Sequence, residues 1–164
     1  MNESVDVPTR ADELPFYAHP GDAGADLRST EDVVLEPGER ASIGTGVSLA
    51  LPDGHVGFVV PRSGLAFKHG ITIVNALGTI DVGYRGEIRV ALLNTDARES
   101  YRVSAGDRIA QLVILPIVRA RFTAVDELPD SVRGTGGFGS TGYAVDAGTE
   151  KAGTRPDSTQ KETA

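Results

Sequence analysis

Short apolar segments separated by glycine and proline turns recur along most of this 164-residue chain. In segments 45–51, 55–60 and 87–94 the apolar residues occupy alternate positions, and a longer apolar run covers 108–117. Alternation with a period of two is typical of strands that bury one face. Short strands with turns between them predict an all-β barrel or jelly roll. The alternating residues are Val47, Leu49 and Leu51, then Val56, Phe58 and Val60, then Ile88, Val90 and Leu92.

Two connecting segments carry their own local predictions. Residues 52–54 read Pro-Asp-Gly, which is a turn by composition. We therefore expect them to join the strands at 45–51 and 55–60 as a hairpin. Residues 64–70 are bounded by glycine and are too short for more than a turn or two of helix.

The composition argues against several classes of protein. The chain has no Cys, which excludes disulfides, thiol nucleophiles and zinc–thiolate sites. Its formal net charge of −7 argues against a protein that coats nucleic acid, because phosphate backbones require Lys and Arg. A small anionic ligand in a local cationic pocket remains compatible with this charge. The sequence shows no apolar run of transmembrane length and no signal peptide, so we expect a cytoplasmic protein without a membrane or nucleic-acid partner.

Residues 133–142, RGTGGFGSTG, are half glycine. Glycine lets backbone N–H groups approach a ligand, and an Arg with nearby hydroxyls suits a phosphate. The segment lacks the Lys of a P-loop, and no helix signal follows it. It is therefore either a flexible linker or an arm that closes on a phosphate. The tail at 147–164 is small and charged without periodicity, which predicts disorder.

Asp81 lies between Ile80 and Val82 within the segment 75–88, NALGTIDVGYRGEI. A carboxylate in an apolar run costs desolvation unless it is paired or functional. Two interpretations follow from the pattern. Asp81 is either a general base that takes a proton from water or a turn residue that caps its own backbone.

The segment PRSGLA, residues 61–66, places an arginine, a hydroxyl and a bare backbone N–H at successive positions. Arg62, Ser63 and Gly64 in this order make a compact anion cradle directly after a predicted strand. The alternative is a solvated Arg62 followed by a Ser63 that caps a short helix.

Two further polar features interrupt otherwise small or apolar segments. Asp22 and Asp26 lie four residues apart in DAGADLRS, where they hold Mg²⁺ directly or through water, or else form an ordinary polar turn. Gln111 lies inside the apolar segment RIAQLVI and must find hydrogen-bond partners. It is either a satisfied core amide or an outward-facing residue.

In their order along the chain, DAGADLRS, PRSGLA, NALGTIDVGYRGEI, RIAQLVI and RGTGGFGSTG resemble the five motifs of the trimeric dUTPases, the deoxyuridine triphosphate nucleotidohydrolases. The resemblance covers roughly residues 14–143. It implies an all-β jelly-roll barrel of the β-clip kind and a homotrimer with three active sites at subunit interfaces. The middle hairpin comes from one subunit, PRSGLA and RIAQLVI from a second, and a flexible C-terminal arm from the third.

The resemblance also implies an activity and a domain organisation. The enzyme hydrolyses dUTP to dUMP and pyrophosphate with Mg²⁺, which removes dUTP from the DNA precursor pool and supplies dUMP for dTMP synthesis. Residues 1–132 form the catalytic body, 133–143 the arm that closes over the site, and 144–164 a disordered tail. The polar segment within 126–131 receives no role.

Individual residues take roles by their match to the motifs. Asp81 matches the carboxylate that activates water, and Asp26 the acid that holds Mg²⁺ through water. Tyr84 matches the residue under the deoxyribose, where a 2′-hydroxyl clashes. The other matched residues are Arg62, Ser63, Gly64 and Gln111 around the phosphates, Asn75, Gly78 and Ile80 at the uracil edge, Arg133, Ser140 and Thr141 at the γ-phosphate, and Phe138 over the uracil.

Two rival functions remain compatible with such a fold. A dCTP deaminase also carries an Ile-Asp-x-Gly hairpin, but it needs a Glu three residues after the closing Ile88, where this chain has Ala91. A regulatory trimer that senses dUTP without turnover does not need Asp81 together with the complete arm. The absence of the Glu at position 91 argues against a deaminase, and the presence of Asp81 with the complete arm argues for a hydrolase.

Overall fold

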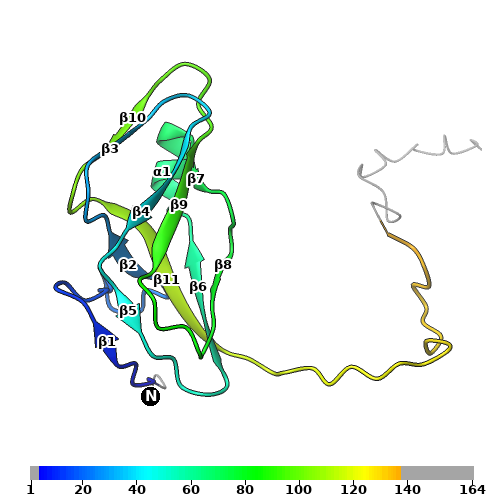
Figure 1. Cartoon of the computed structure of the whole chain (residues 1–164). Coiled ribbons are helices and arrows are strands. Elements are labelled where there is room, and N and C mark those ends of the chain that lie inside the picture. Colours follow the sequence, from blue (N-terminus) through cyan, green and yellow to red (C-terminus); the bar gives the residue numbers. More distant parts are fainter. Residues whose placement is uncertain (1–3, 138–164) are drawn as a thin grey trace, which may run out of the picture. The chain divides into compact units, whose positions relative to one another are not determined.

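The structure is a computed structural model that describes residues 4–137 (Figure 1). The chain divides into two units, one ending at Arg121 and one beginning at Phe122. The first unit is built from short strands and one helix. No helix in the part of the chain that the structure describes is long and apolar enough to span a membrane.

Two sheets and two strand pairs make up the first unit. Figure 1 shows the β3–β10 pair toward the end of this unit that carries the helix, and the β1–β5 pair toward the opposite end. The four-stranded sheet has the order β2-β11-β6-β8, from Ala25–Arg28, Arg108–Pro116, His55–Val60 and Gly78–Ile80. The three-stranded sheet has the order β4-β9-β7, from Arg40–Gly44, Arg89–Asn94 and Ile71–Ile73. The pairs are β1-β5, from Thr9–Arg10 and Ser48–Leu49, and β10-β3, from Tyr101–Val103 and Val33–Leu35.

The strands enclose one apolar core, and every pairing between named strands is antiparallel. Residues 87–94 confirm the predicted alternation, because Ile88, Val90 and Leu92 are each only 1% exposed. Burial of such side chains is the main favourable contribution to folding. The all-β prediction is confirmed by this mostly β architecture. The buried core also includes Leu27, Leu35, Ile43, Val47, Leu49, Leu51, Ile71, Val103, Ile109 and Leu112.

Two details of the predicted strands are wrong. Residues 52–54 contain the expected turn, with Gly54 at φ 76°, but the flanking strands do not pair with each other. Instead β5 pairs with β1, and β6 pairs with β11 and β8. In β6 Val59 joins the core at 3% exposed, whereas only Val56 of the predicted residues is buried, at 5%, and Phe58 and Val60 are half-buried. Pairing with strands that are distant in sequence determines both the neighbours of β5 and β6 and the burial of residues in β6.

The helix α1 spans Ser63–His69, as short as its sequence predicts. Its N-cap is Arg62 in an extended conformation without a side-chain capping bond, so Ser63 is not the cap. The helix ends at Gly70, whose φ of 65° is left-handed and favours glycine. This short helix continues directly from the end of β6 and therefore fixes where the PRSGLA segment lies.

The described part of the second unit, residues 122–137, has turns but no helix or strand. Backbone N–H groups of Gly134 and Gly136 donate to the carbonyls of Ser131 and Arg133, at 3.1 Å each. The guanidinium Nε of Arg133 also donates to the carbonyl of Gly136 at 2.9 Å. Arg133 is thus held locally by the glycine segment that follows it.

Candidate active site

The carboxylate of Asp26 is the centre of a buried ion-pair cluster. Its side chain is 2% exposed. Oδ1 lies 3.2 Å from Nε of Arg62, and Oδ2 accepts a hydrogen bond from Nη1 of Arg108 at 3.0 Å. Nε2 of Gln111 donates to Oδ1 at 3.3 Å. The cluster therefore joins three of the predicted motifs, and it adds Arg108, which the sequence analysis did not identify.

The order of the four-stranded sheet explains why these residues meet. Asp26 on β2 lies directly opposite Gln111 on β11, and Gln111 lies opposite Val60 on β6. Opposite residues of antiparallel strands share a face and lie close together. Because Arg62 follows Val60 by two residues, the exit of β6 delivers its guanidinium to Asp26. Gln111 is therefore outward-facing on its strand and hydrogen-bonded, which decides between its two interpretations.

Gly24 shapes the position of the Gln111 side chain. A Cβ at Gly24 would lie 3.0 Å from Cβ and 3.2 Å from Cδ of Gln111. Such distances are shorter than an ordinary carbon contact of about 3.5–4.0 Å. A larger residue at this position would therefore displace the amide. The motif DAGADLRS thus contributes both the carboxylate of Asp26 and the bare backbone beside Gln111.

A hollow of about 250 Å³ opens next to this cluster at the start of α1. Ser63 and Gly64 are exposed at its edge, and no side chain would obstruct the backbone at Gly64. Arg62 uses Nε toward Asp26 and Nη1 toward the carbonyl of Arg108, at 3.1 Å, which leaves its other N–H groups for a ligand. The hollow is cationic, and it is lined by Arg62, Ser63, Gly64, Leu65, Lys68, His69 and Gln111.

Tyr101 on β10 packs beside this region. Its ring centroid lies 5.0 Å from that of His69. Burial raises the pKa of the Tyr101 phenol most, and the negative charge of Asp107 raises it further, against a smaller opposite effect of Arg62. The Tyr101 phenol is therefore a neutral group that packs against His69 at the edge of this region.

The fit of Asp26 to a magnesium ion is limited. A carboxylate has about four lone-pair sites, and Arg62, Arg108 and Gln111 already occupy three of them. Asp22 does not join it, because Oδ2 of Asp22 accepts the backbone N–H of His19 at 2.9 Å within a turn. Within residues 4–137 no group of three or more His, Asp or Glu side chains converges as a metal site. A cation here would need most of its ligands from a bound substrate.

The Asp81 hairpin forms the second part of the candidate site. Asp81 directly follows β8 and is exposed. The backbone N–H of Tyr84 donates to the carbonyl of Asp81 at 3.0 Å, so the turn is closed by the backbone and not by the carboxylate. Among the described residues, no hydrogen bond or ion pair involves that carboxylate. Asp81 therefore does not cap its own backbone, and it is available as a base.

The Tyr84 side chain folds over the hairpin. Its Oη donates to the carbonyl of Glu87 at 2.8 Å. A Cβ at Gly86 would lie 2.5 Å from Oη and 2.7 Å from Cζ of Tyr84, so only glycine leaves room for this ring. Tyr84 remains 43% exposed in this position. The role of Gly86 was not identified from the sequence.

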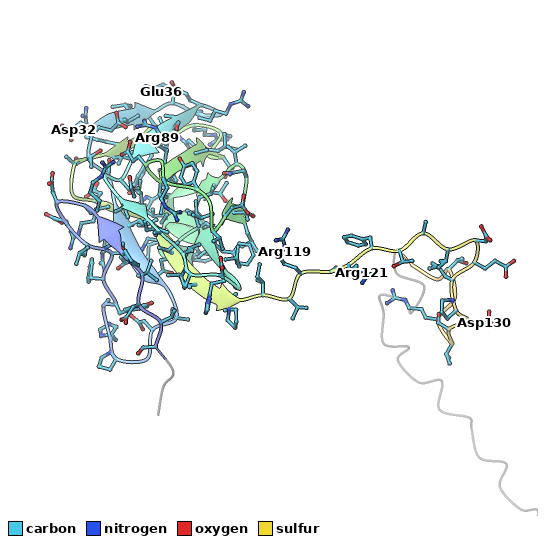
Figure 2. All side chains as sticks on the ribbon, turned by 60° about the horizontal axis from the view of Figure 1, so that its bottom comes forward. Asp32, Glu36, Arg89, Arg119, Arg121 and Asp130 are labelled. Atoms are coloured by element: carbon cyan, nitrogen blue, oxygen red, sulfur yellow. The ribbon has the colours of Figure 1, made fainter. Side chains whose placement is uncertain are left out.

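Glu87 connects this hairpin to the loop at Gly46. Its Oε1 accepts the backbone N–H of Gly46 at 2.8 Å, and its Oε2 lies 3.4 Å from Nη1 of Arg89. The hydrogen bond from Gly46, followed by the charge of Arg89, lowers the pKa of the Glu87 carboxyl, although burial acts in the opposite direction. Arg89 also pairs with Glu31 at 3.2 Å and is labelled in Figure 2. This network holds the base of the Tyr84 hairpin.

The predicted uracil-edge residues lie together on the same hairpin. Asn75, Gly78 and Ile80 line a small notch of about 60 Å³. A Cβ at Gly78 would lie 3.3 Å from Cβ of Val59 and 3.5 Å from Nδ2 of Asn75. The side-chain amide of Asn75 therefore lies beside the backbone of Gly78, which is buried against Val59 of β6.

One chain thus brings the predicted residues together in two groups. Asp26, Arg62, Ser63, Gly64 and Gln111 surround the cationic hollow, whereas Asn75, Gly78, Ile80, Asp81 and Tyr84 lie along the hairpin. No hydrogen bond or ion pair among residues 4–137 joins the two groups. Arg133 belongs to the second unit, and Phe138, Ser140 and Thr141 lie outside the described residues.

An all-β scaffold with a cationic hollow and a separate carboxylate, unpaired among residues 4–137, is typical of proteins that bind phosphate compounds and activate water. The family model described as dUTPase matches residues 11–142. The deoxyuridine 5′-triphosphate nucleotidohydrolase of Leifsonia xyli is 63% identical over 152 residues, which cover 93% of this chain and 100% of the relative. That of Thermobifida fusca is 66% identical over 129 residues, covering 79% of this chain and 72% of the relative.

Solved structures agree with this similarity. The Staphylococcus bacteriophage 80alpha dUTPase with dUPNHPP superposes with a TM-score of 0.78 at 34% identity, over 85% of this chain and 100% of the phage chain. A mutant dUTPase from phage phi11 of S. aureus, whose structure reveals the coordination of a structural Mg(II) ion, has a TM-score of 0.70 at 30% identity. This match covers 77% of this chain and 100% of the phage phi11 chain. The chain belongs to the dUTPase family.

Proposed function

We propose that this protein hydrolyses dUTP to dUMP and pyrophosphate through a water molecule activated by Asp81. Its family and its relatives, which are named deoxyuridine 5′-triphosphate nucleotidohydrolases, support dUTP hydrolysis. The observation that carries the mechanism is the exposed Asp81 carboxylate, which no donor among the described residues occupies. A carboxylate without a partner can accept the proton of an attacking water.

The reaction is a single in-line displacement. Asp81 takes a proton from water while the water oxygen forms a bond to the α-phosphorus. The bond between that phosphorus and the bridging oxygen of the β-phosphate breaks, and its electron pair leaves with pyrophosphate. Positioning and charge stabilisation supply most of the catalysis in such transfers. No covalent intermediate with the protein is required.

The cationic hollow is the proposed site of the triphosphate. Arg62 keeps N–H groups that Asp26 does not use, and Ser63, Gly64 and Gln111 offer neutral donors beside it. Arg133, with Ser140 and Thr141 of the arm, would grip the γ-phosphate. Mg²⁺ would neutralise charge on the triphosphate, held mainly by phosphate oxygens and reaching Asp26 through water.

The hairpin is the proposed site of the nucleoside. Tyr84 would pack under the deoxyribose, and a 2′-hydroxyl would clash with the ring that Gly86 accommodates. Asn75, with the backbone near Gly78 and Ile80, would read the uracil edge, and Phe138 of the arm would cover the base. Selection against UTP and against other bases follows from these contacts.

A homotrimer would unite the two groups of residues. Within one chain they form separate sites, so a complete site requires a second copy that places its hairpin against the cationic hollow. The outer face of β6 and β11 carries the half-buried pair Phe58 and Val113, and Val118 after β11 is 96% exposed. Figure 2 shows Arg119 and Arg121 on this outgoing segment. The apolar side chains of Phe58, Val113 and Val118 favour burial of this face against another chain.

The proposed domain organisation has three parts. A jelly-roll body of residues 1–132 carries the two groups, an arm of residues 133–143 closes on the triphosphate, and residues 144–164 form a tail without a catalytic role. Arm closure would exclude bulk solvent from the site, apart from the attacking water, only when a triphosphate is bound.

The test is pyrophosphate release with Mg²⁺ from dUTP, measured beside dCTP, dTTP and UTP. Release from dUTP alone establishes the reaction together with its base and sugar selectivity. Tight binding of dUTP without release would instead indicate the sensing trimer, and ammonia release from dCTP would indicate a deaminase.

A further inference from the structure

We infer that Arg108 and Asp26 form a positioning pair that fixes Arg62 and Gln111 for the triphosphate, so that Asp26 contributes to nucleotide binding independently of magnesium. The inference rests on the proposed function and assigns a role to Arg108. Arg108 itself lies outside the lining of the cationic hollow and acts through Asp26. It is therefore a positioning residue.

The contacts around Asp26 hold its carboxylate at both oxygens. Each carboxylate oxygen accepts from a different side: Oδ2 from Arg108, and Oδ1 from Arg62 and Gln111. A carboxylate held from both sides has little freedom to rotate. Its orientation then sets the direction of the two side chains that border the hollow.

Strand β11 is irregular at Arg108. The pairing of β11 with β2 shifts register between Arg108 and Ala110. In a regular strand, residues three apart face opposite sides, so Arg108 and Gln111 would diverge. A bulge adds one residue and re-aims the side chain before it. Arg108 consequently reaches the same carboxylate as Gln111.

Arg108 is also linked directly to Arg62. The backbone carbonyl of Arg108 accepts from Nη1 of Arg62 at 3.1 Å, while Nε of Arg62 pairs with Asp26. Two nitrogen atoms of one planar guanidinium are thus held by separate acceptors, which restricts its rotation. The remaining N–H groups of Arg62 then have a defined direction before any ligand binds, which is preorganisation.

Burial makes this cluster sensitive to the loss of one member. Asp26 is 2% exposed, whereas the side chain of Arg108 is 42% exposed. A buried carboxylate that loses one of two cationic partners shifts toward its remaining donors. Removal of Arg108 would therefore move Arg62 and Gln111 without touching the ligand.

The test is calorimetric titration with dUPNHPP, performed once with Mg²⁺ and once with EDTA. Asp26→Asn and Arg108→Gln should each weaken binding by about tenfold relative to the natural chain, with and without the metal. Arg108→Lys should restore most of the affinity, since one donor suffices for Oδ2. The control Arg102→Gln removes the same charge from an exposed position on β10 and should bind normally.

Coupling gives the second readout. The double variant Asp26→Asn with Arg108→Gln should bind dUPNHPP no more weakly than the single variant with the lower affinity. Both changes break the same Asp26–Arg108 pair, so the second change should add no further loss. It also removes the buried charge together with its partner, so it serves if Arg108→Gln alone does not fold.

Three results would overturn the inference. The first is a loss of dUPNHPP affinity in Asp26→Asn that occurs only with Mg²⁺. The second is normal binding in EDTA by Arg108→Gln or by the double variant. The third is a double variant whose loss of binding free energy equals the sum of the two single losses. A natural chain that does not bind dUPNHPP at all would overturn the proposed function as well.

Discussion

Gly86→Ala is expected to impair sugar selection while leaving the fold intact. The added Cβ would lie 2.7 Å from Cζ of Tyr84, against an ordinary carbon contact of about 3.5–4.0 Å, so the ring must move by about 1 Å. The ring is 43% exposed and free to swing outward, which keeps the structural cost low. The hydrogen bond from Tyr84 to the Glu87 carbonyl is lost, at about 0.5–1.5 kcal/mol of stability.

Catalysis should suffer more than stability. A displacement of about 1 Å in a positioning group can cost up to about 100-fold in rate. We therefore expect kcat/KM for dUTP to fall by about 10- to 100-fold, and the preference for dUTP over UTP to narrow. The assay is pyrophosphate release from both nucleotides, with thermal melting as the stability measurement.

Gly83→Ala is the matched control, because a Cβ there meets no atom within 4 Å. It lies in the same hairpin and should keep both activity and selectivity. Unchanged selection between dUTP and UTP in Gly86→Ala would refute the reasoning, as would an equal loss in Gly83→Ala.

Three further predictions address other parts of the molecule. The Cβ added by Gly24→Ala would lie 3.0 Å from Cβ of Gln111 and should displace that side chain by a few tenths of an ångström. The Kd for dUPNHPP should therefore rise several-fold, and an unchanged Kd would show that this contact does not position Gln111. Glu87 has a folded-state pKa below its usual 4.5, so its contribution to stability is present above that pH and is lost as the pH falls through the lowered value. Urea denaturation of Glu87→Gln should therefore show a smaller loss of stability on acidification below about pH 4.5 than the natural chain, and parallel curves would contradict it. A chain that ends at Arg133 should keep its assembly size on a sizing column, because the core lies in the first unit, yet lose most turnover; a smaller assembly would show that the arm also holds the subunits together.

The sequence predicted the strands better than it predicted their partners. The period-two pattern of residues 87–94 identifies the core face correctly, because Ile88, Val90 and Leu92 are all buried in the core. The same pattern misled at residues 55–60, where apolar residues occupy both faces and the pairings with β11 and β8 place Val59 in the core. Strand pairing is a long-range property, so a local turn such as residues 52–54 does not reveal it.

The candidate site shows a similar division. The motif residues Asp26, Arg62 and Gln111 were recognised as polar groups in unusual places, and the sheet order brings them together. Arg108 resembled an ordinary charge at the start of a strand, because the bulge that re-aims it leaves no sequence signal. Gly24 and Gly86 have roles set by the side chains opposite them, which only the folded structure reveals.

The central claim is that Asp81 activates water. The most direct measurement compares pyrophosphate release and dUPNHPP binding in Asp81→Asn and in the natural chain. The substitution is nearly isosteric and removes only the basic oxygen, so turnover should fall by at least about 100-fold while the Kd stays within a few-fold. Turnover near that of the natural chain would contradict the assignment of Asp81 as the base.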